Sequence, residues 1–419
     1  MAIYTTWFAE LRQAAEDQAA TLPLPTPDKT KITNWNFTPK QTKPVDEEVF
    51  TSLEAAPGVV RALVDMNKSV HNLYVQKNNI AAFTTLTEEA SKQGVIFSNM
   101  IDAMMIYPDL VKKYYMCADG IRVDSHKLAA LNTALLNGGV FVYVPENVVV
   151  ADPLQAIFMT DRADVSLYHH VIIVAEAHAK VTYVENYIST VESDEQVANL
   201  ISEVYVGAHA EVTYGAVDTL NAGVTTFVHR TAYVGEHGKM EWALGLMNYG
   251  NTVSENVTLL KGDDSYADSK TVVVGNGVQK QNFTTNIIHT GKRSNGMILK
   301  HGVMKDETSS IFNGIGHIKH GATGSNAEQT SRVLMLDKTA RGDANPILLI
   351  DEDDVTAGHA ASAGRVDEMQ LYYLMSRGIP RKEAERLVIH GFLAPVMQGL
   401  AVEQVQKQLV DVIEAKINS

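Results

Sequence analysis

Hydrophobic and polar residues alternate through the middle of this chain, from about residue 140 to about residue 355. Short runs such as Val181-Thr182-Tyr183-Val184 place apolar side chains at every second position, which is the period of a β-strand. Glycine and asparagine separate the runs, and no amphipathic stretch of helical length interrupts them. The pattern therefore predicts a region of successive strands without crossover helices.

Three of these segments align with one another: EAHAKVTYVE, GAHAEVTYGA and GEHGKMEWAL. Their histidines, His178, His209 and His237, lie 31 and 28 residues apart. A repeat of this length is typical of stacked supersecondary units, each of which covers the hydrophobic face of the one before. The repeat favours a β-solenoid, and a large β-sandwich or jelly roll is the alternative.

Helical patterns precede the strands. Residues 1–20 predict one helix, a proline-rich connector follows at 22–30, and residues 86–116 predict two more helices. Gly138-Gly139 would end the last helix before the strands begin.

Helical patterns also follow the strands. Asp367 is a suitable N-cap for a helix, and Gly378 stands where a C′ glycine would end it. Pro380 suits the first turn of a second helix. Residues 401–417 predict an amphipathic helix, which we expect to pack on its own domain in preference to a partner.

These patterns divide the chain into three parts. We assign 1–137 to a mainly helical N-terminal domain, 138–355 to the β-solenoid core and 356–419 to a C-terminal helical domain. With 419 residues, 45% hydrophobic and 20% charged, the chain is long and apolar enough for such a division.

The net charge of −14 argues against a surface for nucleic acids or anionic membranes. No apolar run of about 18 residues is present, and the N-terminal stretch does not resemble a signal peptide. The single cysteine, Cys117, cannot form an intrachain disulfide, which fits a reducing cytoplasm, and we expect it to be a small buried hydrophobic residue.

Motifs for common enzyme chemistry are missing. The nearest fragment to a phosphate-binding loop is Gly291-Lys292-Arg293-Ser294, which lacks the preceding glycine, so we expect no nucleotide to be bound by this chain. No G-x-S-x-G nucleophile motif occurs. The acidic pairs Asp263-Asp264 and Asp353-Asp354 are more typical of solvated turns than of catalytic dyads, and we predict that the protein is not an enzyme.

Six histidines lie in or near the predicted turns. A row of metal ligands is one interpretation, and a polar residue repeated at the same turn of each coil is the other. We favour the second, because no carboxylate or further histidine recurs at a fixed ligand spacing. The six are His178, His209, His237, His301, His317 and His320.

His359 differs from these because small residues surround it: Ala357, Gly358, Ala360 and Ala361. Such neighbours predict a tight turn with an accessible imidazole. Imidazole is a suitable ligand for iron and can replace a thiolate in a cluster. A polar turn residue that bonds to the backbone is the alternative reading of His359.

The stretch GHAASAGRVDEMQLYYLMSRGIPRKEAERLVIHGF, residues 358–392, resembles the C-terminal signature of the SufB/SufD family, the scaffold subunits of the SufBCD iron–sulfur cluster assembly complex. Ser376-Arg377-Gly378-Ile379 matches its last element residue for residue, and VFVYVP at 140–145 resembles the entry to the family's β domain. The resemblance implies a right-handed parallel β-helix flanked by N- and C-terminal helical regions. Ala357 and Gly358 stand where many members have a cysteine, which makes the chain more like the SufD branch than SufB.

The resemblance also implies a function. It implies a non-catalytic cytoplasmic scaffold that pairs with a SufB-like subunit and binds a SufC-like ATPase through its C-terminal helices. It implies a transient iron–sulfur cluster shared with SufB, to which His359 would contribute one ligand. The residues expected to contact the ATPase are Tyr372, Leu374, Arg377, Gly378, Ile379 and Phe392.

Two other functions stay open at this point. A polysaccharide-active β-helix enzyme would need calcium-binding carboxylates and a basic catalytic residue in one groove, usually with a secretion signal. A SufB-like paralogue acting as a homodimer, without SufB, is the second.

Overall fold

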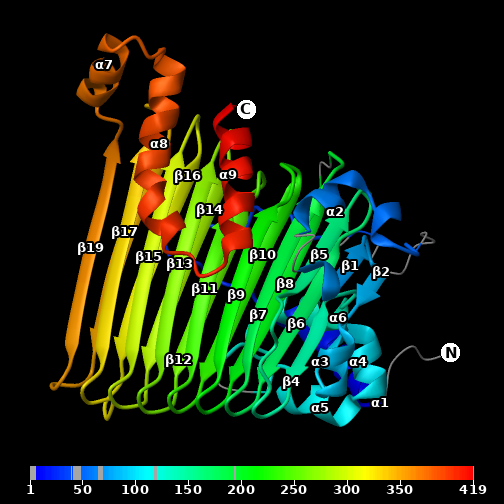
Figure 1. Ribbon diagram of the computed structural model, residues 1–419. Coiled ribbons are helices and arrows are strands. Elements are labelled where there is room, and N and C mark those ends of the chain that lie inside the picture. The colour runs from blue at the N-terminus through cyan, green and yellow to red at the C-terminus, as the bar shows by residue number, and fades with distance from the viewer. Residues whose placement is uncertain are drawn as a thin grey trace.

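Strands that alternate between two sheets form the body of the protein (Figure 1). The computed structural model describes residues 6–38, 40, 49–64, 69–117, 120–192 and 195–418. One sheet has ten strands in the order β19-β17-β15-β13-β11-β9-β7-β5-β1-β2, and the other has nine in the order β18-β16-β14-β12-β10-β8-β6-β4-β3. From β4 onward, two consecutive strands make one coil, and about eight coils stack into a β-solenoid.

The neighbouring strands of successive coils run parallel, which confirms the predicted solenoid and rules out the antiparallel sandwich. Antiparallel pairing occurs at β1–β2 and β3–β4, near the start of the solenoid. The strands are β1 (Leu73–Lys77), β2 (Ile80–Thr85), β3 (Ile96–Asn99), β4 (Val140–Val144), β5 (Leu154–Thr160), β6 (Leu167–Ala175), β7 (Lys180–Ser189), β8 (Gln196–Val206), β9 (Glu211–Thr219), β10 (Val224–Val234), β11 (Lys239–Leu246), β12 (Thr252–Leu260), β13 (Tyr266–Gly275), β14 (Lys280–His289), β15 (Asn295–Met304), β16 (Ser309–Ile318), β17 (Asn326–Met335), β18 (Arg341–Ile350) and β19 (Thr356–Arg365).

Helices lie at both ends of the chain, as the sequence predicted. No helix among the described residues is long and apolar enough to cross a membrane. The helices are α1 (Thr6–Thr21), η1 (Leu53–Ala55), α2 (Gly58–Leu63), η2 (Ser69–His71), α3 (Glu88–Lys92), α4 (Met100–Ile106), α5 (Pro108–Tyr114), α6 (Lys127–Ala134), α7 (Glu368–Ser376), α8 (Arg381–Gln398) and α9 (Glu403–Asn418).

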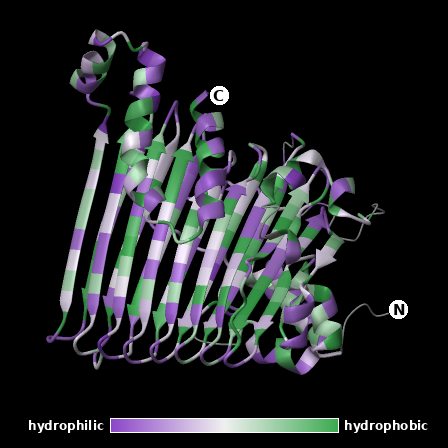
Figure 2. Ribbon diagram, in the orientation of Figure 1, coloured by the Kyte–Doolittle hydropathy of each residue, from purple (hydrophilic) through white to green (hydrophobic). Residues whose placement is uncertain are grey.

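The interior of the solenoid is a continuous apolar core in which equivalent residues of successive coils stack. Tyr183 packs on Tyr214 with ring centroids 5.0 Å apart, and Tyr214 packs on Trp242 at 4.9 Å. Bands of hydrophobic and hydrophilic residues alternate along the strands, because successive side chains point to opposite faces (Figure 2). This alternation is the pattern by which the sequence predicted the strands.

A lysine is also enclosed in this interior. Lys300 of β15 is fully buried, and its Nζ donates to the carbonyl oxygens of Phe283 at 3.1 Å and Asn313 at 2.6 Å. Burial lowers the pKa of Lys300 to about 7, because the apolar surroundings disfavour the charged form.

The buried lysine predicts a pH dependence of stability. Between about pH 7 and about pH 10, the unfolded chain holds a proton on Lys300 that the folded chain has lost. The free energy of unfolding should therefore rise with pH in this window, by up to about 1.4 kcal/mol per pH unit. The Lys300→Met variant lacks this contribution. Thermal unfolding at about pH 7 and about pH 9 should therefore show that the stability of the wild type, relative to that of the variant, is greater at the higher pH. Parallel pH profiles of the two proteins would contradict the prediction.

Helices α8 and α9 cover the outer face of the ten-stranded sheet (Figure 1). A Cβ atom built on Gly215 or Gly245 would lie 2.7 Å from Val405 or 2.3 Å from Leu409, so these glycines allow α9 to approach the strands closely. The C-terminal helix therefore packs within this chain, on the strands of the solenoid core. The apolar cluster beneath the helices includes Val184, Val217, Ala243, Val272, Ile389, Leu393, Val396, Val405, Leu409 and Ile413.

The proline-rich connector after α1 runs along the outer face of the nine-stranded sheet. Ile32 and Phe37 pack against Tyr168, Phe227 and other residues of that sheet. Further along, Asn282 Nδ2 donates to the carbonyl oxygen of Asp28 at 2.7 Å. Residues after α1 therefore make packing contacts and a hydrogen bond with strands of later coils.

The structure corrects two details of the predicted division. The strands continue to Arg365, so the boundary placed at residue 355 leaves out β19. That strand consists mostly of alanine, glycine and serine, so it carries no alternating hydrophobic signal. Within 86–116, three short helices and the strand β3 replace the two predicted helices, because the four residues of β3 are too few to show a period.

Candidate functional site

The solenoid ends in an open coil made of β18 and β19. Each is the last strand of its sheet, and within the described part of the chain neither has a strand on its outer edge. Nearly every residue of β19 is exposed, whereas the equivalent strands of internal coils are mostly buried. The backbone hydrogen-bonding groups along this edge are therefore available to another chain.

His359 lies in the middle of β19, not in a turn as the sequence predicted. The small residues around it form an extended strand because they pair in register with β17. His359 stands opposite Gln329, which stands opposite Ile298, and both of these side chains are buried. Parallel strands in register keep equivalent residues on the same face, so His359 belongs to the row that faces the interior of the solenoid.

The imidazole of His359 is exposed because no further coil covers this row. Its ring nitrogens have no hydrogen-bond partner among the described residues. The described residues contain no group of three or more His, Cys, Asp or Glu side chains placed to hold a metal ion. His359 could therefore supply one nitrogen ligand, and further ligands would have to come from another molecule.

Helix α7 and the turn after it have the caps that the sequence predicted. The Asp367 side chain accepts a hydrogen bond from the backbone N–H of Met369 at 2.9 Å. Gly378 has a φ of 87° and donates its N–H to the carbonyl oxygen of Met375 at 2.9 Å. Because a positive φ favours glycine, this residue ends the helix and lets the chain turn into α8.

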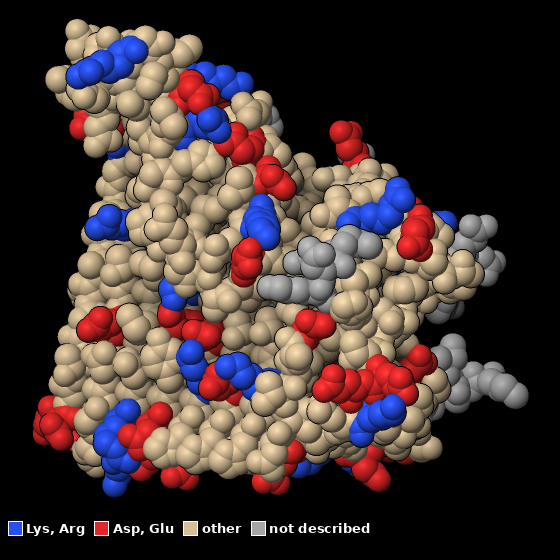
Figure 3. All heavy atoms as spheres, viewed as in Figure 1, with Lys and Arg blue, Asp and Glu red and all other residues tan. Residues whose placement is uncertain are grey.

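Helix α7 projects beyond the sheets and is mostly solvent-exposed, with Leu371 its buried residue (Figure 1). Met369 is 71% exposed, Tyr372 67% and Tyr373 58%. We call the exposed apolar side chains of this helix the α7 patch: Met369, Tyr372, Tyr373 and Met375. The tip where α7 lies, at the upper left of Figure 3, carries few charged side chains. A cluster of exposed apolar residues on a soluble surface is typical of an interaction site.

Five of the six residues predicted to contact a partner lie on α7 or in the turn after it. Tyr372 is exposed, and Leu374 and Ile379 are half-buried. The guanidinium of Arg377 lies over the Tyr373 ring, 5.1 Å from its centroid, and donates to its hydroxyl at 3.2 Å. The partner contacts predicted from the sequence did not include Met369, Tyr373 or Met375, although apolar residues around the whole of a short helix are a signal for them.

Phe392, the sixth residue, does not lie on the same surface. It is half-buried on α8, where its ring packs against His301 at 4.9 Å and its carbonyl oxygen is 2.7 Å from His301 Nδ1. Phe392 lines a cavity of about 460 Å³ between the end of the last strands, α7 and α8. The lining residues are Leu334, Arg365, Val366, Asp367, Gln370, Val388, Gly391 and Phe392.

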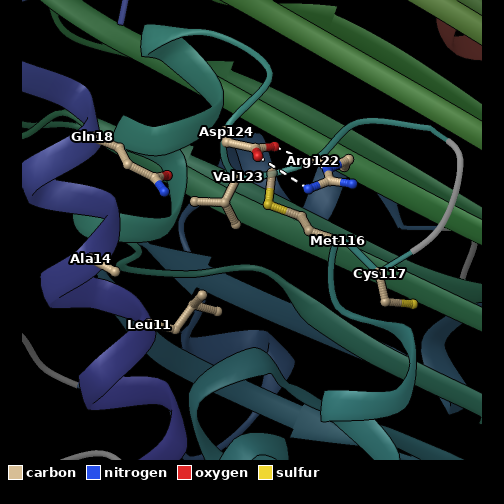
Figure 4. A pocket seen from close by; sticks show the side chains of 8 residues that line it. All are labelled: Leu11, Ala14, Gln18, Met116, Cys117, Arg122, Val123 and Asp124. Atoms are coloured by element: carbon tan, nitrogen blue, oxygen red, sulfur yellow. Dashed lines mark hydrogen bonds and ion pairs between the residues drawn. The ribbon is translucent and has the colours of Figure 1, made fainter. Parts of the chain in front are cut away.

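Cys117 lies far from this region, beside α1. It lines a cavity of about 350 Å³ together with Leu11, Met116 and the ion-paired Arg122 and Asp124 (Figure 4). The thiol is exposed and not buried as predicted, but it donates to the carbonyl oxygen of Lys113 at 2.8 Å. Partial burial raises the pKa of Cys117, so the thiol stays protonated at neutral pH and is not an activated nucleophile.

Comparison with known proteins identifies the family of this chain. The region described as "SUF system FeS cluster assembly, SufBD core domain" matches residues 158–392, and the "SufBD protein N-terminal region" matches residues 64–156. The iron–sulfur cluster assembly protein SufD of Bacillus subtilis is 60% identical over 412 residues, which cover 98% of this chain and 94% of that protein. An iron–sulfur cluster assembly SufBD family protein of Staphylococcus epidermidis is 28% identical over 336 residues, covering 80% of this chain and 72% of the relative. With a core domain that spans more than half of its length and a relative of this similarity, the chain belongs to the SufBD family of iron–sulfur cluster assembly proteins.

Proposed function

We propose that this chain is a non-catalytic scaffold subunit that pairs with a SufB-like subunit along its open coil and binds a SufC-like ATPase through the α7 patch. The nascent iron–sulfur cluster is the cargo, and His359 contributes one of its ligands. The observation that carries the proposal is the position of His359, exposed on the inward-facing row of the last coil. The family assignment favours this function over a polysaccharide-active enzyme.

The edge of β19 supports pairing with another scaffold chain. Proteins usually protect exposed edge strands with charged side chains, proline or bulges, because a bare edge recruits other strands. From Thr356 to Gly364, β19 contains no aspartate, glutamate, lysine or arginine, and it contains no proline. A partner strand could extend the ten-stranded sheet by main-chain hydrogen bonds, as in other cases of strand addition.

A shared cluster follows from the ligands that are present. The chain has one cysteine, and its thiol lies beside α1, at the opposite end of the solenoid from β19 (Figure 1). Clusters are held mainly by several thiolates, and an imidazole can replace one of them. We therefore infer that the thiolates come from the partner subunit. Ligands divided between two chains separate when the chains move, which suits a site that must release its cargo.

The α7 patch supports binding of the ATPase. Its tyrosines and Arg377 are residue types enriched among binding hot spots. Leu371 of the helix is buried, and Glu368 forms an exposed ion pair with Arg381 of α8 at 3.1 Å, so α7 contacts the rest of the chain while the patch stays exposed. Helices α8 and α9 are occupied by their packing on the sheet, which leaves α7 as the accessible element of the three.

Co-expression tests the proposal as a whole. The chain should co-purify with a SufB-like subunit and a SufC-like ATPase of the same organism, in a complex that contains one copy of this chain. A homodimer that forms without the SufB-like subunit and binds the ATPase equally well would favour the second candidate, a self-pairing scaffold. Failure to recover the ATPase in either arrangement would contradict the proposal.

A further inference from the structure

The segment after α1, residues 22–38, begins and ends beside α6 and β6 but reaches the far end of the solenoid in between. At its start, the carbonyl oxygen of Pro23 accepts a hydrogen bond from the backbone N–H of Lys127, at 2.8 Å. Just past its end, the backbone N–H of Lys40 donates to Ser166 Oγ at 3.0 Å. We call residues 22–38 the strap and residues 28–30 its tip.

The tip of the strap lies on β14 and β18, outside the nine-stranded sheet. Asn282 Nδ2 of β14 donates to the carbonyl oxygen of Asp28 at 2.7 Å and to Thr30 Oγ1 at 2.8 Å. Lys29 Nζ donates to Asn345 Oδ1 of β18. Lys29 has a φ of 57°, in the left-handed region, where the chain turns back. A segment that starts beside the first coils therefore touches the last one.

The strap matches the surface on which it lies. One column of outward-facing positions runs in register across the nine-stranded sheet, with aromatic or apolar residues in most of the early strands and asparagine in the last three. Ile32 and Phe37 of the strap pack on the aromatic and apolar members, whereas the polar tip bonds to asparagines. The column consists of Tyr168, Asn199, Phe227, Val253, Asn282, Asn313 and Asn345.

The three asparagines form a ladder that carries the contact from strand to strand. Asn345 Nδ2 donates to Asn313 Oδ1 at 3.0 Å, and Asn313 Nδ2 donates to Asn282 Oδ1 at 3.4 Å. Asn282 and Asn313 are almost completely buried, although they point away from the core. Because the tip bonds to both ends of the ladder, it ties β14, β16 and β18 together.

We propose that the strap is a brace that keeps β18 ordered as a docking edge, so that the N-terminal region controls pairing at the opposite end of the solenoid. A terminal coil has one neighbouring coil to stabilise it, and the strap adds contacts that do not depend on a second one. An edge that is already ordered costs less conformational entropy when another chain binds to it. The control of pairing rests on the proposed scaffold function, whereas the bracing of β18 is a property of this chain alone.

The brace can be released at its tip without disturbing the strap's backbone. Lys29→Gly tolerates the positive φ, and Thr30→Ala removes the acceptor for Asn282. Hydrogen exchange followed by mass spectrometry should show that hydrogen-bonded amides in 341–350 exchange about fivefold faster or more in the double variant, while those of β10 are unchanged. Lys31→Ala is the matched control, because Lys31 is exposed on the same strap and makes no side-chain hydrogen bond or ion pair with the described residues.

A second variant tests the control of pairing. Ile32→Asp places a charge where Ile32 is 2% exposed, so it should lift the strap from the sheet. Its affinity for the SufB-like subunit, measured by surface plasmon resonance, should fall about threefold or more, because fewer molecules hold β18 in the binding-competent form. Unchanged exchange at β10 shows that the solenoid of this variant is intact.

The two measurements separate the possible outcomes. Faster exchange at 341–350 together with weaker pairing supports the brace. Wild-type exchange at 341–350 in both strap variants overturns it. Faster exchange with unchanged affinity overturns the control of pairing. If the wild-type chain does not bind the SufB-like subunit at all, the proposed scaffold function fails, and the exchange measurement still decides whether the strap braces β18.

Discussion

A strain whose only copy of this protein carries His359→Ala should lose most of its iron–sulfur enzyme activity, although the variant folds and assembles normally. The side chain is exposed on β19 and has no hydrogen-bond partner among the described residues, so its removal should change the free energy of unfolding by less than about 0.5 kcal/mol. The ligand it contributes has no substitute nearby in this chain. The measurement is the activity of iron–sulfur enzymes in cell extracts, together with recovery of the intact complex.

Two further substitutions separate a ligand from a structural residue. His359→Cys should restore part of the activity, because a thiolate can take the place of the imidazole at iron. Ser362→Ala changes the same strand on its other face, since Ser362 pairs with the exposed Arg332, and it should have no effect. Normal enzyme activity in the His359→Ala strain would remove His359 from the cluster site.

The double variant Met369→Asp, Tyr372→Asp should bind the ATPase subunit at least about a hundredfold more weakly than the wild type. The two side chains are 71% and 67% exposed, so the changes leave the core intact. Truncation of a buried hot-spot residue commonly costs about 2 kcal/mol or more, and here each substitution would also bury an unpaired charge at the interface. Binding can be measured by surface plasmon resonance with the purified ATPase.

The matched control for the α7 patch is Val278→Asp. Val278 is 75% exposed in the turn between β13 and β14. The substitution therefore introduces the same type of charge at an exposed apolar site away from α7. Undiminished binding by the double variant would show that the ATPase docks on another surface. Removing residues 366–419 is a less specific experiment, because it also uncovers the apolar cluster beneath α8 and α9.

The solenoid could be predicted from the sequence because its coils repeat. The spacing of His178, His209 and His237 indicated a turn that recurs in successive coils, and the structure places each of them at a positive φ. The alternation of apolar and polar residues in the strands between these turns indicated which face of each strand is buried. Both signals are local, so a single sequence is sufficient to reveal them.

The last coil could not be predicted in the same way. Residues 356–365 form a strand because β17 offers them a parallel edge, and their own side chains show no period. The sequence analysis therefore assigned His359 to a turn. The position of Phe392 was missed for a related reason, since its contact with His301 joins residues 91 positions apart. Contacts of this kind depend on tertiary packing and leave no local pattern.

The open end also sets the order in which the molecule loses structure. In a linear array, each coil is stabilised by its own folding and by its contacts with its neighbours, and the coil of β18 and β19 has one neighbouring coil where internal coils have two. Its amides should exchange with solvent before those of β10 or β12, by local fraying without global unfolding. A strand added along β19 would make this coil an internal one, so slower exchange at residues 356–365 would report the arrival of a partner.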